Sequence, residues 1–314
     1  MDYKKIVCIP SDYKILPYQL PYYTPGFKNY YKKGNAVQSP CEISMEKWFE
    51  SSFMLLLNAI GESYFPVCRF SDGEYKFLLG EQKPSKRLSF IDKSYIIFKR
   101  KINQFKKGNS NFSANTLPNV SSGLYDMRKV KFFRSNIYPQ KIKNLSQDGF
   151  LALHLSYGEK PFQEEYFPAL REFLKINNIN LTLQNYIPFQ FVYGWLRGEK
   201  RKQLLQDRNI LLIHSAQGEK KQRIEKHLIE KELVQSVEWY SISQSQAMLD
   251  DIDVSELMHK NYDIAFMGAG VGKINLFDKF KLLNIPIVDI GFVFEVWADE
   301  SNKYKRNMMI PDKK

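Results

Sequence analysis

The C-terminal half of the chain alternates short apolar runs with stretches of helical character. Four runs have the apolar, β-branched composition of strands: 210–215, 237–242, 262–267 and 287–290. Helices are expected between them at 218–233, 247–259 and 273–283. Strands separated by helices of this length form βαβ units with parallel strands. We therefore expect an α/β fold, with a Rossmann-like, mostly parallel sheet flanked by helices, whose ligands bind at the carboxyl ends of the strands.

The first half of the chain is less regular. Strands are expected at 64–70 and 150–155, and helices at 44–60, 92–107 and 164–175. Residues 1–43 hold five prolines among many tyrosines, which disfavours helix and predicts an extended arm. We therefore divide the chain into an extended N-terminal arm (1–43), one α/β domain (44–300) and a basic C-terminal tail (301–314).

Two polar or aromatic segments leave more than one interpretation open. The polar loop 109–123 is long for a connection and is a candidate cover for a site, or an ordinary surface loop. The aromatic cluster 186–195 suits the frame of an acceptor sugar or of a groove near lipid, and core packing explains it equally well.

The predicted strand 64–70 stops at Ser71-Asp72-Gly73, and a short helical run is expected to begin at Glu74, so that residues 69–74 read Arg-Phe-Ser-Asp-Gly-Glu. Side chains at positions i and i+2 of extended or tight-turn backbone project to the same side. Asp72 and Glu74 are therefore expected to converge beside Gly73. Mg²⁺ and Mn²⁺ are held by one or two carboxylates together with substrate phosphates, and Arg69 is placed to bind a phosphate oxygen. The alternative is a surface turn, because Asp-Gly is a common turn dipeptide.

A second candidate lies between the predicted strand 262–267 and the helix after it. The small residues Gly268, Ala269 and Gly270 leave backbone N–H groups at a helix start, where a diphosphate binds well, and Lys273 adds a positive charge. A tight strand-to-helix turn that needs small residues is the alternative. Lys220, in the Gly-Glu-Lys run 218–220, is a further candidate cation after another predicted strand.

Residues 69–74 resemble the Arg-aromatic-Gly-Asp-Gly-Glu signature of the GT-D-type glycosyltransferases, the DUF1792 family. Residues 262–291, which include Tyr-Asp-Ile-Ala-Phe-Met-Gly-Ala-Gly and Pro-Ile-Val-Asp-Ile-Gly, are similar to a second region of that family. The resemblance implies that Asp72 and Glu74 bind a metal and the diphosphate of a nucleotide sugar. The departures are Ser71 for a glycine, Ala269-Gly270 for Pro-Thr, and Phe292 where a histidine is expected.

The hypothesis from this resemblance is a metal-dependent glycosyltransferase that uses Mn²⁺ or Mg²⁺. It would move a sugar from a nucleotide-diphosphate sugar, a UDP-sugar, to a hydroxyl of a glycan or lipid-linked glycan in bacterial surface polysaccharide or glycoconjugate synthesis. Inversion, which the family leads us to expect, requires a general base. Asp289 and Glu295 are the candidates, at or just beyond a predicted strand end. A Mg²⁺-dependent phosphohydrolase or nucleotidyltransferase, a nucleic-acid-binding protein and a descendant with a decayed site are the alternatives.

The net charge of +12, from 46 Lys and Arg against 34 Asp and Glu, favours anionic partners such as nucleotide sugars or an acidic membrane face. The basic residues are spread along the chain and no nucleic-acid-binding module is recognisable, which disfavours nucleic acid. Three cysteines without a Cys-x-x-Cys pair, and four scattered histidines, disfavour a disulfide framework and a zinc site. With neither a signal peptide nor an apolar run of about 18 residues, a cytoplasmic protein is expected, and peripheral contact with the membrane's inner face stays open.

Overall fold

The computed structural model of the chain describes the parts that form the sheet and the helices around it. The described residues are 14–17, 36–39, 43, 45–79, 132–153, 156–157, 167–198, 200–242, 247 and 252–305. The helix expected at 92–107, the loop 109–123 and most of the arm 1–43 lie outside them, so those predictions, like the domain boundaries, stay predictions.

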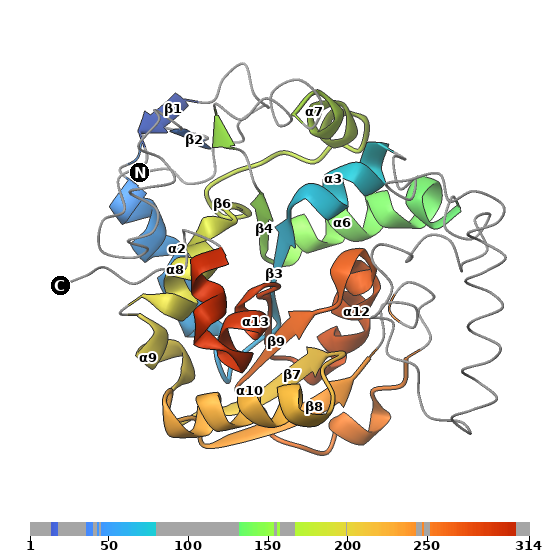
Figure 1. The fold of residues 1–314 in the computed structure, drawn as a ribbon. Coiled ribbons are helices and arrows are strands. Elements are labelled where there is room, and N and C mark those ends of the chain that lie inside the picture. The colour runs from blue at the N-terminus through green and yellow to red at the C-terminus, as the bar shows by residue number, and fades with distance from the viewer. Residues whose placement is uncertain are drawn as a thin grey trace, which may run out of the picture.

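A seven-stranded sheet forms the centre of the molecule, with the strand order β6-β4-β3-β10-β9-β7-β8 (Figure 1). Every neighbouring pair in it is parallel, which confirms the α/β fold expected from the sequence. Its strands are β3 (Phe65–Phe70), β4 (Phe150–Leu153), β6 (Tyr186–Pro188), β7 (Asn209–His214), β8 (Ser236–Ser241), β9 (Ile264–Gly268) and β10 (Pro286–Asp289).

Helices cover both faces of the sheet (Figure 1). One face carries α6 (Tyr138–Asp148) and α12 (Lys273–Phe280), which contact each other. The opposite face carries α2 (Met45–Ala59), α8 (Gln190–Arg197), α10 (Gly218–Glu230) and α13 (Val293–Ala298). The other helices in the described ranges are α3 (Asp72–Leu79), α7 (Phe167–Ile176), α9 (Arg201–Leu205) and the short helices η3 (Phe133–Ile137), η5 (Ser255–Leu257), η6 (Gly270–Gly272), η7 (Lys281–Leu283) and η8 (Glu300–Lys305).

Three short strands form a second, antiparallel sheet in the order β1-β2-β5. They are β1 (Lys14–Pro17), β2 (Ala36–Ser39) and β5 (Ser156–Tyr157). Two of these strands come from the predicted arm and the third follows β4, so the described part of the arm pairs with a strand from the predicted α/β domain.

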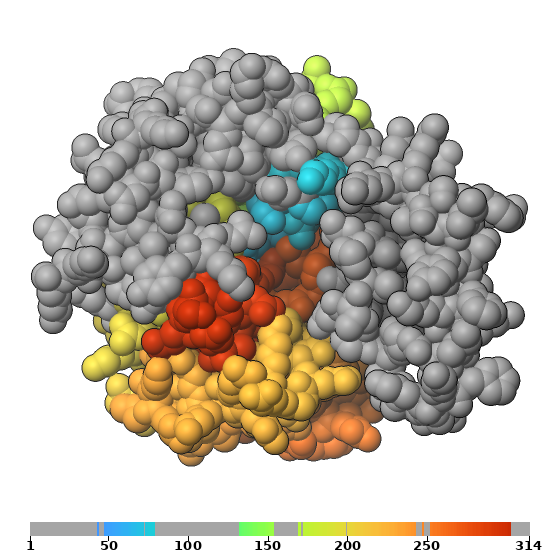
Figure 2. Space-filling view, viewed as in Figure 1, coloured from blue at the N-terminus to red at the C-terminus, as the bar shows by residue number. Residues whose placement is uncertain are grey.

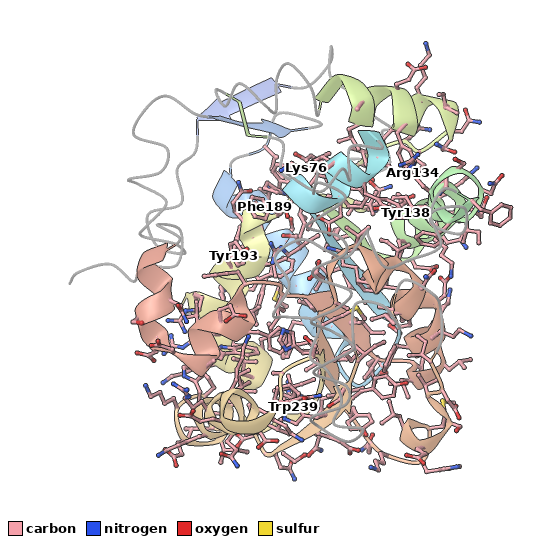
Figure 3. All side chains as sticks on the ribbon, turned by 45° about the vertical axis from the view of Figure 1, so that its right-hand side comes forward. Lys76, Arg134, Tyr138, Phe189, Tyr193 and Trp239 are labelled. Atoms are coloured by element: carbon pink, nitrogen blue, oxygen red, sulfur yellow. The ribbon has the colours of Figure 1, made fainter. Side chains whose placement is uncertain are left out.

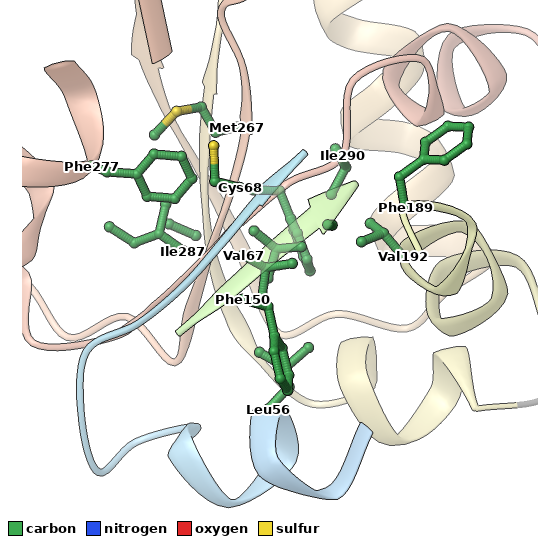
Figure 4. Packing of buried hydrophobic residues seen from close by; sticks show 14 of the residues in the cluster. Leu56, Val67, Cys68, Phe150, Phe189, Val192, Met267, Phe277, Ile287 and Ile290 are labelled. Carbon is green, nitrogen blue, oxygen red and sulfur yellow. The ribbon is translucent and has the colours of Figure 1, made fainter. Parts of the chain in front are cut away.

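The core lies on both faces of the central strands, as period-two alternation of side chains requires. Val67 of β3 packs toward Leu56 and Phe150, whereas its neighbour Cys68 faces Met267 and Phe277 (Figure 4). Burial raises the pKa of the Cys68 thiol, which behaves here as a small apolar side chain.

The aromatic cluster 186–195 belongs to this core. Every residue of 186–195 is buried, and Trp195 lies within 6.5 Å, between ring centroids, of Phe49, Phe53 and Phe150. Core packing is therefore the interpretation that the structure supports for most of this cluster.

Two expectations about the helices need correction. Among the described residues of the helix expected at 247–259, 252–259 contain only the single turn η5 instead of a continuous helix. The helix after β3 begins at Asp72 and not at Glu74. In the described part of the chain no helix has both the length and the apolar character needed to cross a membrane.

The order in which the chain adds strands to the sheet changes between β3 and β10. From β3 the chain builds outward through β4 and β6, whereas β9, β7 and β8 lie on the other side of β10. Crevices at the carboxyl ends of strands at such a switch point are where open α/β sheets bind ligands. The predicted motifs at 69–74 and 268–273 both lie at this edge.

Candidate functional site

Lys273 forms ion pairs with two acidic side chains that lie at the carboxyl ends of the central strands β3 and β10. Its Nζ lies 2.7 Å from Glu74 Oε1 and 2.5 Å from Asp289 Oδ2. All three side chains are between 4% and 6% exposed. Glu74 belongs to the first turn of α3, Asp289 is the last residue of β10 and Lys273 is the first residue of α12. The structure thus brings together three of the predicted site residues, as a buried ion triad.

Glu74 is held in place by the start of its own helix. The backbone N–H of Ser71 donates to Glu74 Oε2 at 2.9 Å, and the Glu74 N–H donates to Ser71 O at 3.0 Å. A serine followed three residues later by a glutamate that reaches back to its N–H is half of a capping box. The Ser-x-x-Glu spacing is the sequence signal that places the helix start at Asp72.

This helix start changes the local argument for Asp72 and Glu74. Both residues lie in the first turn of α3 and not in the extended or tight-turn backbone from which their convergence was predicted. The Asp72 side chain lies outside the described part of the structure, and the pairing of Asp72 with Glu74 stays a prediction.

The Lys273 ammonium stays charged in its buried position. Burial alone lowers the pKa of Lys273, but the carboxylates of Asp289 and Glu74 outweigh burial and raise this pKa above its ordinary value. The triad is therefore an ion cluster of one positive and two negative groups in which Lys273 holds both carboxylates.

Arg69 supplies a second buried cation at the same edge. Its guanidinium carbon lies 4.5 Å from the Tyr193 ring centroid and 5.3 Å from that of Phe189, and these two rings lie close together in Figure 3. Arg69 is 6% exposed, and its Nε and Nη1 have no hydrogen-bond partner in the described structure. Burial lowers the pKa of Arg69, but Tyr193, Asp289 and Glu74 outweigh it, so the net shift is upward.

Gly291 leaves the space that the Arg69 guanidinium occupies. A Cβ at Gly291 would lie 2.4 Å from Arg69 Nη1. The φ angle of Gly291, +47°, is also in the left-handed region that favours glycine. Only a glycine fits both conditions. The Ile-Gly pair after β10, found in the sequence as part of the resemblance, thus has a physical role in seating Arg69.

The two predicted motifs contact each other. A Cβ at Gly73, which is exposed, would lie 3.8 Å from Val271 Cγ2 in the turn between β9 and α12. In Figure 2 the cyan segment of α3, the orange segment of α12 and the red segment of α13 surround a hollow on this face. The motifs, almost 200 residues apart in the chain, therefore share one edge.

Packing also explains part of the small-residue turn. A Cβ at Gly268 would lie 2.8 Å from both His214 Cδ2 and Phe294 Cδ2. Ala269 is buried, and Gly270 has a φ of +60°. The tight-turn interpretation of 268–270 is thus supported, and the phosphate-binding interpretation stays a prediction.

His214 is a residue of this edge that the sequence analysis did not select. It ends β7, stacks on Phe294 with ring centroids 4.3 Å apart, and its Nδ1 accepts the Ala216 N–H at 2.9 Å. Burial, with a smaller contribution from Lys220, lowers the pKa of His214 to about 4. His214 is therefore a neutral donor through Nε2 near pH 7. Its position at the end of an apolar run was the available signal.

Glu295 and Lys220 lie in a separate ion pair. Glu295 lies on α13 rather than at the strand end, and its Oε1 pairs with Lys220 Nζ of α10. Glu295 is 41% exposed, unlike the buried Asp289. Phe292, in the position where a histidine was expected, precedes α13 and packs against the core.

The described residues do not fit a divalent cation on Glu74. One oxygen of Glu74 is bound by the Lys273 ammonium and the other by a backbone N–H. Within the described ranges, no group of three or more His, Cys, Asp or Glu side chains is arranged to hold a metal. A metal there would compete with a buried ammonium for the same carboxylate.

Three solved structures that are similar to this chain are DUF1792 proteins. One is a DUF1792 glycosyltransferase from Streptococcus sanguinis, with 17% identity over 85% of this chain and 86% of that one, and a TM-score of 0.34. A selenomethionine-substituted domain of unknown function 1792 gives 13% identity, 84% and 88% coverage and a TM-score of 0.40. A DUF1792 domain described as having a distinct glycosyltransferase fold has 12% identity over 84% of this chain and 88% of that one, and a TM-score of 0.43.

The family to which these structures belong is the one that the motifs resemble. No protein-family model matches the chain, and neither does any curated protein.

Proposed function

We propose that this protein is a glycosyltransferase that moves a sugar from a nucleotide-diphosphate sugar, a UDP-sugar, to a hydroxyl group of a glycan. The observation that carries the proposal is the meeting of Arg69, Glu74, Lys273 and Asp289 at the carboxyl edge of a parallel sheet, at its switch point. Both sequence motifs that resemble GT-D-type enzymes contribute to this group.

Arg69 is the group best suited to the donor diphosphate. A guanidinium binds phosphate through paired N–H groups. Two nitrogens of Arg69 have no hydrogen-bond partner among the described residues, and the contacts with Tyr193 and Phe189 orient the plane of the guanidinium. The positive charge would stabilise the leaving diphosphate as the bond to the sugar breaks. The turn η6 before α12 is a further candidate for the diphosphate, through backbone N–H groups at its start.

The transfer step needs a base for the acceptor hydroxyl. The acceptor oxygen forms a bond to the anomeric carbon, the bond from that carbon to the diphosphate oxygen breaks, and the hydroxyl proton passes to a carboxylate. Asp289 and Glu295 remain the candidates. The exposed position of Glu295 favours contact with an acceptor, whereas Asp289 is engaged by Lys273.

The finer parts of the hypothesis are proposals of the same kind. A glycan or lipid-linked glycan acceptor in surface polysaccharide synthesis, and a cytoplasmic protein with peripheral contact to an acidic membrane, are consistent with the net charge of +12. The Mn²⁺ or Mg²⁺ expected at Asp72 and Glu74 has no support from the described side chains, and no step above uses it.

The test is a calorimetric titration of the purified protein with UDP-glucose, UDP-galactose and UDP-N-acetylglucosamine, beside an Arg69→Ala variant. Binding of a UDP-sugar that weakens at least about tenfold in the variant is expected. Product analysis then separates transfer from hydrolysis, because a transferase needs an acceptor for fast turnover. Absence of binding by any nucleotide sugar, or turnover to free sugar at an equal rate without an acceptor, would contradict the proposal.

A further inference from the structure

Two buried carboxylates face one point in this site, and that point is occupied by an ammonium. Glu74 Oε1 and Asp289 Oδ2 both contact Lys273 Nζ, at 2.7 and 2.5 Å. Carboxylate oxygens converging in this way are the ligands that Mg²⁺ and Mn²⁺ prefer. Lys273 therefore stands at the position that a divalent cation would take between these two carboxylates.

Among the described side chains of this edge, four charges balance one another without a metal. Lys273 and Arg69 are positive, Glu74 and Asp289 are negative, and Arg69 interacts electrostatically with both carboxylates. Burial makes each of these charges dependent on its partners. A divalent cation added to the group would meet two positive side chains and carboxylates that are already engaged.

Lys273 has no freedom to leave by rotation into water. Its side chain is 5% exposed, and it begins a helix whose next residues, Ile274, Asn275 and Leu276, are buried. The two carboxylates come from rigid elements, the first turn of α3 and the end of β10. The ion triad is therefore a fixed part of the fold and not a surface ion pair.

We propose that Lys273 is a built-in cation that takes the place of a divalent metal between Glu74 and Asp289, so that the protein binds its donor without Mn²⁺ or Mg²⁺. Lys273 then neutralises the two carboxylates, as a metal would. The identity of the donor rests on the proposed function. The donor diphosphate then meets a neutralised edge in place of two unpaired carboxylates.

The experiment is a Mn²⁺ titration followed by electron paramagnetic resonance, in which bound Mn²⁺ loses the sharp signal of the free ion. Wild-type protein is expected to leave the Mn²⁺ signal unchanged. Lys273→Ala removes the ammonium and keeps both carboxylates, and it is expected to bind one Mn²⁺ at least about tenfold more tightly than wild type. The same variant with Glu74→Gln is expected to lose this binding.

Lys141→Ala is the matched control, because it removes a lysine from an ordinary pair with one carboxylate, Lys141 Nζ to Asp278 Oδ2 at 2.8 Å. It should gain no Mn²⁺ site. Circular dichroism establishes that each variant is folded. If Lys273→Ala does not fold, the wild-type titration beside Glu74→Gln still decides: Mn²⁺ bound by wild type and lost in Glu74→Gln overturns the proposal.

UDP-sugar titrations in EDTA and in Mn²⁺ separate this inference from the proposed function. Equal affinity in both conditions supports both. Binding only with Mn²⁺ keeps the glycosyltransferase and overturns the role of Lys273. Absence of UDP-sugar binding in both conditions contradicts the proposed function. Even then, a Mn²⁺ site gained by Lys273→Ala supports Lys273 as the internal cation. If a folded Lys273→Ala protein gains no Mn²⁺ site, the role proposed for Lys273 is overturned.

Discussion

Lys273 and Asp289 form the closest ion pair of the buried triad, with Nζ 2.5 Å from Oδ2, and this pair connects the start of α12 to the end of β10. A buried carboxylate in this position depends on its counter-ion, because loss of one partner leaves the other charged and unsolvated. The pair therefore ties the stability of the sheet edge to the chemistry of the candidate site.

Replacement of Lys273 by methionine is expected to lower the free energy of unfolding by about 3–5 kcal/mol. Methionine keeps most of the side-chain volume, so the loss would come from two carboxylates left without their ammonium. Lys141→Met, at a partly exposed pair, should cost no more than about 1 kcal/mol. Urea denaturation of the two variants measures both values, and equal small losses would show that the triad contributes little.

Replacement of Gly291 by alanine is expected to displace the Arg69 guanidinium, because the new Cβ would lie 2.4 Å from Nη1. UDP-sugar affinity should fall at least about tenfold. Gly61→Ala is the matched control: Gly61 also has a positive φ, +76°, but nothing lies within 4 Å of its Cβ position.

The control variant is expected to lose about 1–2 kcal/mol of stability from backbone strain while keeping its affinity for the donor. Calorimetry and denaturation of both variants separate strain from displacement. Unchanged donor affinity in a folded Gly291→Ala protein would count against a role for Arg69 in donor binding.

The free energy of unfolding is expected to fall between pH 6.5 and pH 4 because of His214. Burial first, and Lys220 second, lower its folded-state pKa to about 4 from the ordinary 6.5. The unfolded chain takes up a proton below pH 6.5 and the folded chain does not, so this contribution is complete above pH 6.5 and is lost as the pH falls to 4. Its size is about 3 kcal/mol.

A pH series of urea denaturation for wild type and His214→Asn measures this contribution. The asparagine oxygen is expected to accept the Ala216 N–H that Nδ1 accepts now, and the variant should show a shallower pH dependence. An NMR titration that gave His214 a midpoint near 6.5 would contradict the expectation.

Asp289 and Glu295 are expected to separate binding from turnover. Asp289→Asn removes the charge that pairs with Lys273 and should weaken UDP-sugar binding. Glu295 belongs to a more exposed ion pair, so Glu295→Gln should lower kcat with little change in donor affinity. The general-base role of Glu295 predicts a loss of about 100-fold or more in kcat. Unchanged kcat in Glu295→Gln would remove it as the base and leave Asp289.

Local patterns in the sequence were enough for most of the fold. The alternation of apolar runs and helices predicted six of the seven strands of the parallel sheet, with ends that differ from the structure by a few residues, whereas β6 lies in the segment 186–195 that was described only as an aromatic cluster. Ser71 and Glu74 also contained the signal for a helix start at Asp72, which the Asp-Gly turn pattern obscured. The range 247–259 shows the limit of helical spacing, because the part of it that the structure describes forms only a short turn.

The sequence by itself determined the α/β class and the placement of the motifs 69–74 and 268–273 after two strands. Only the tertiary structure decided that β3 and β10 are neighbours, and hence that Lys273 pairs with Glu74, 199 residues away, and with Asp289. The physical reason is that strand and helix formation depends on neighbouring residues, whereas a counter-ion is chosen by strand order and by the burial that makes an unpaired charge costly. In the structure Glu74, which the sequence predicts to bind a metal, is the buried partner of Lys273.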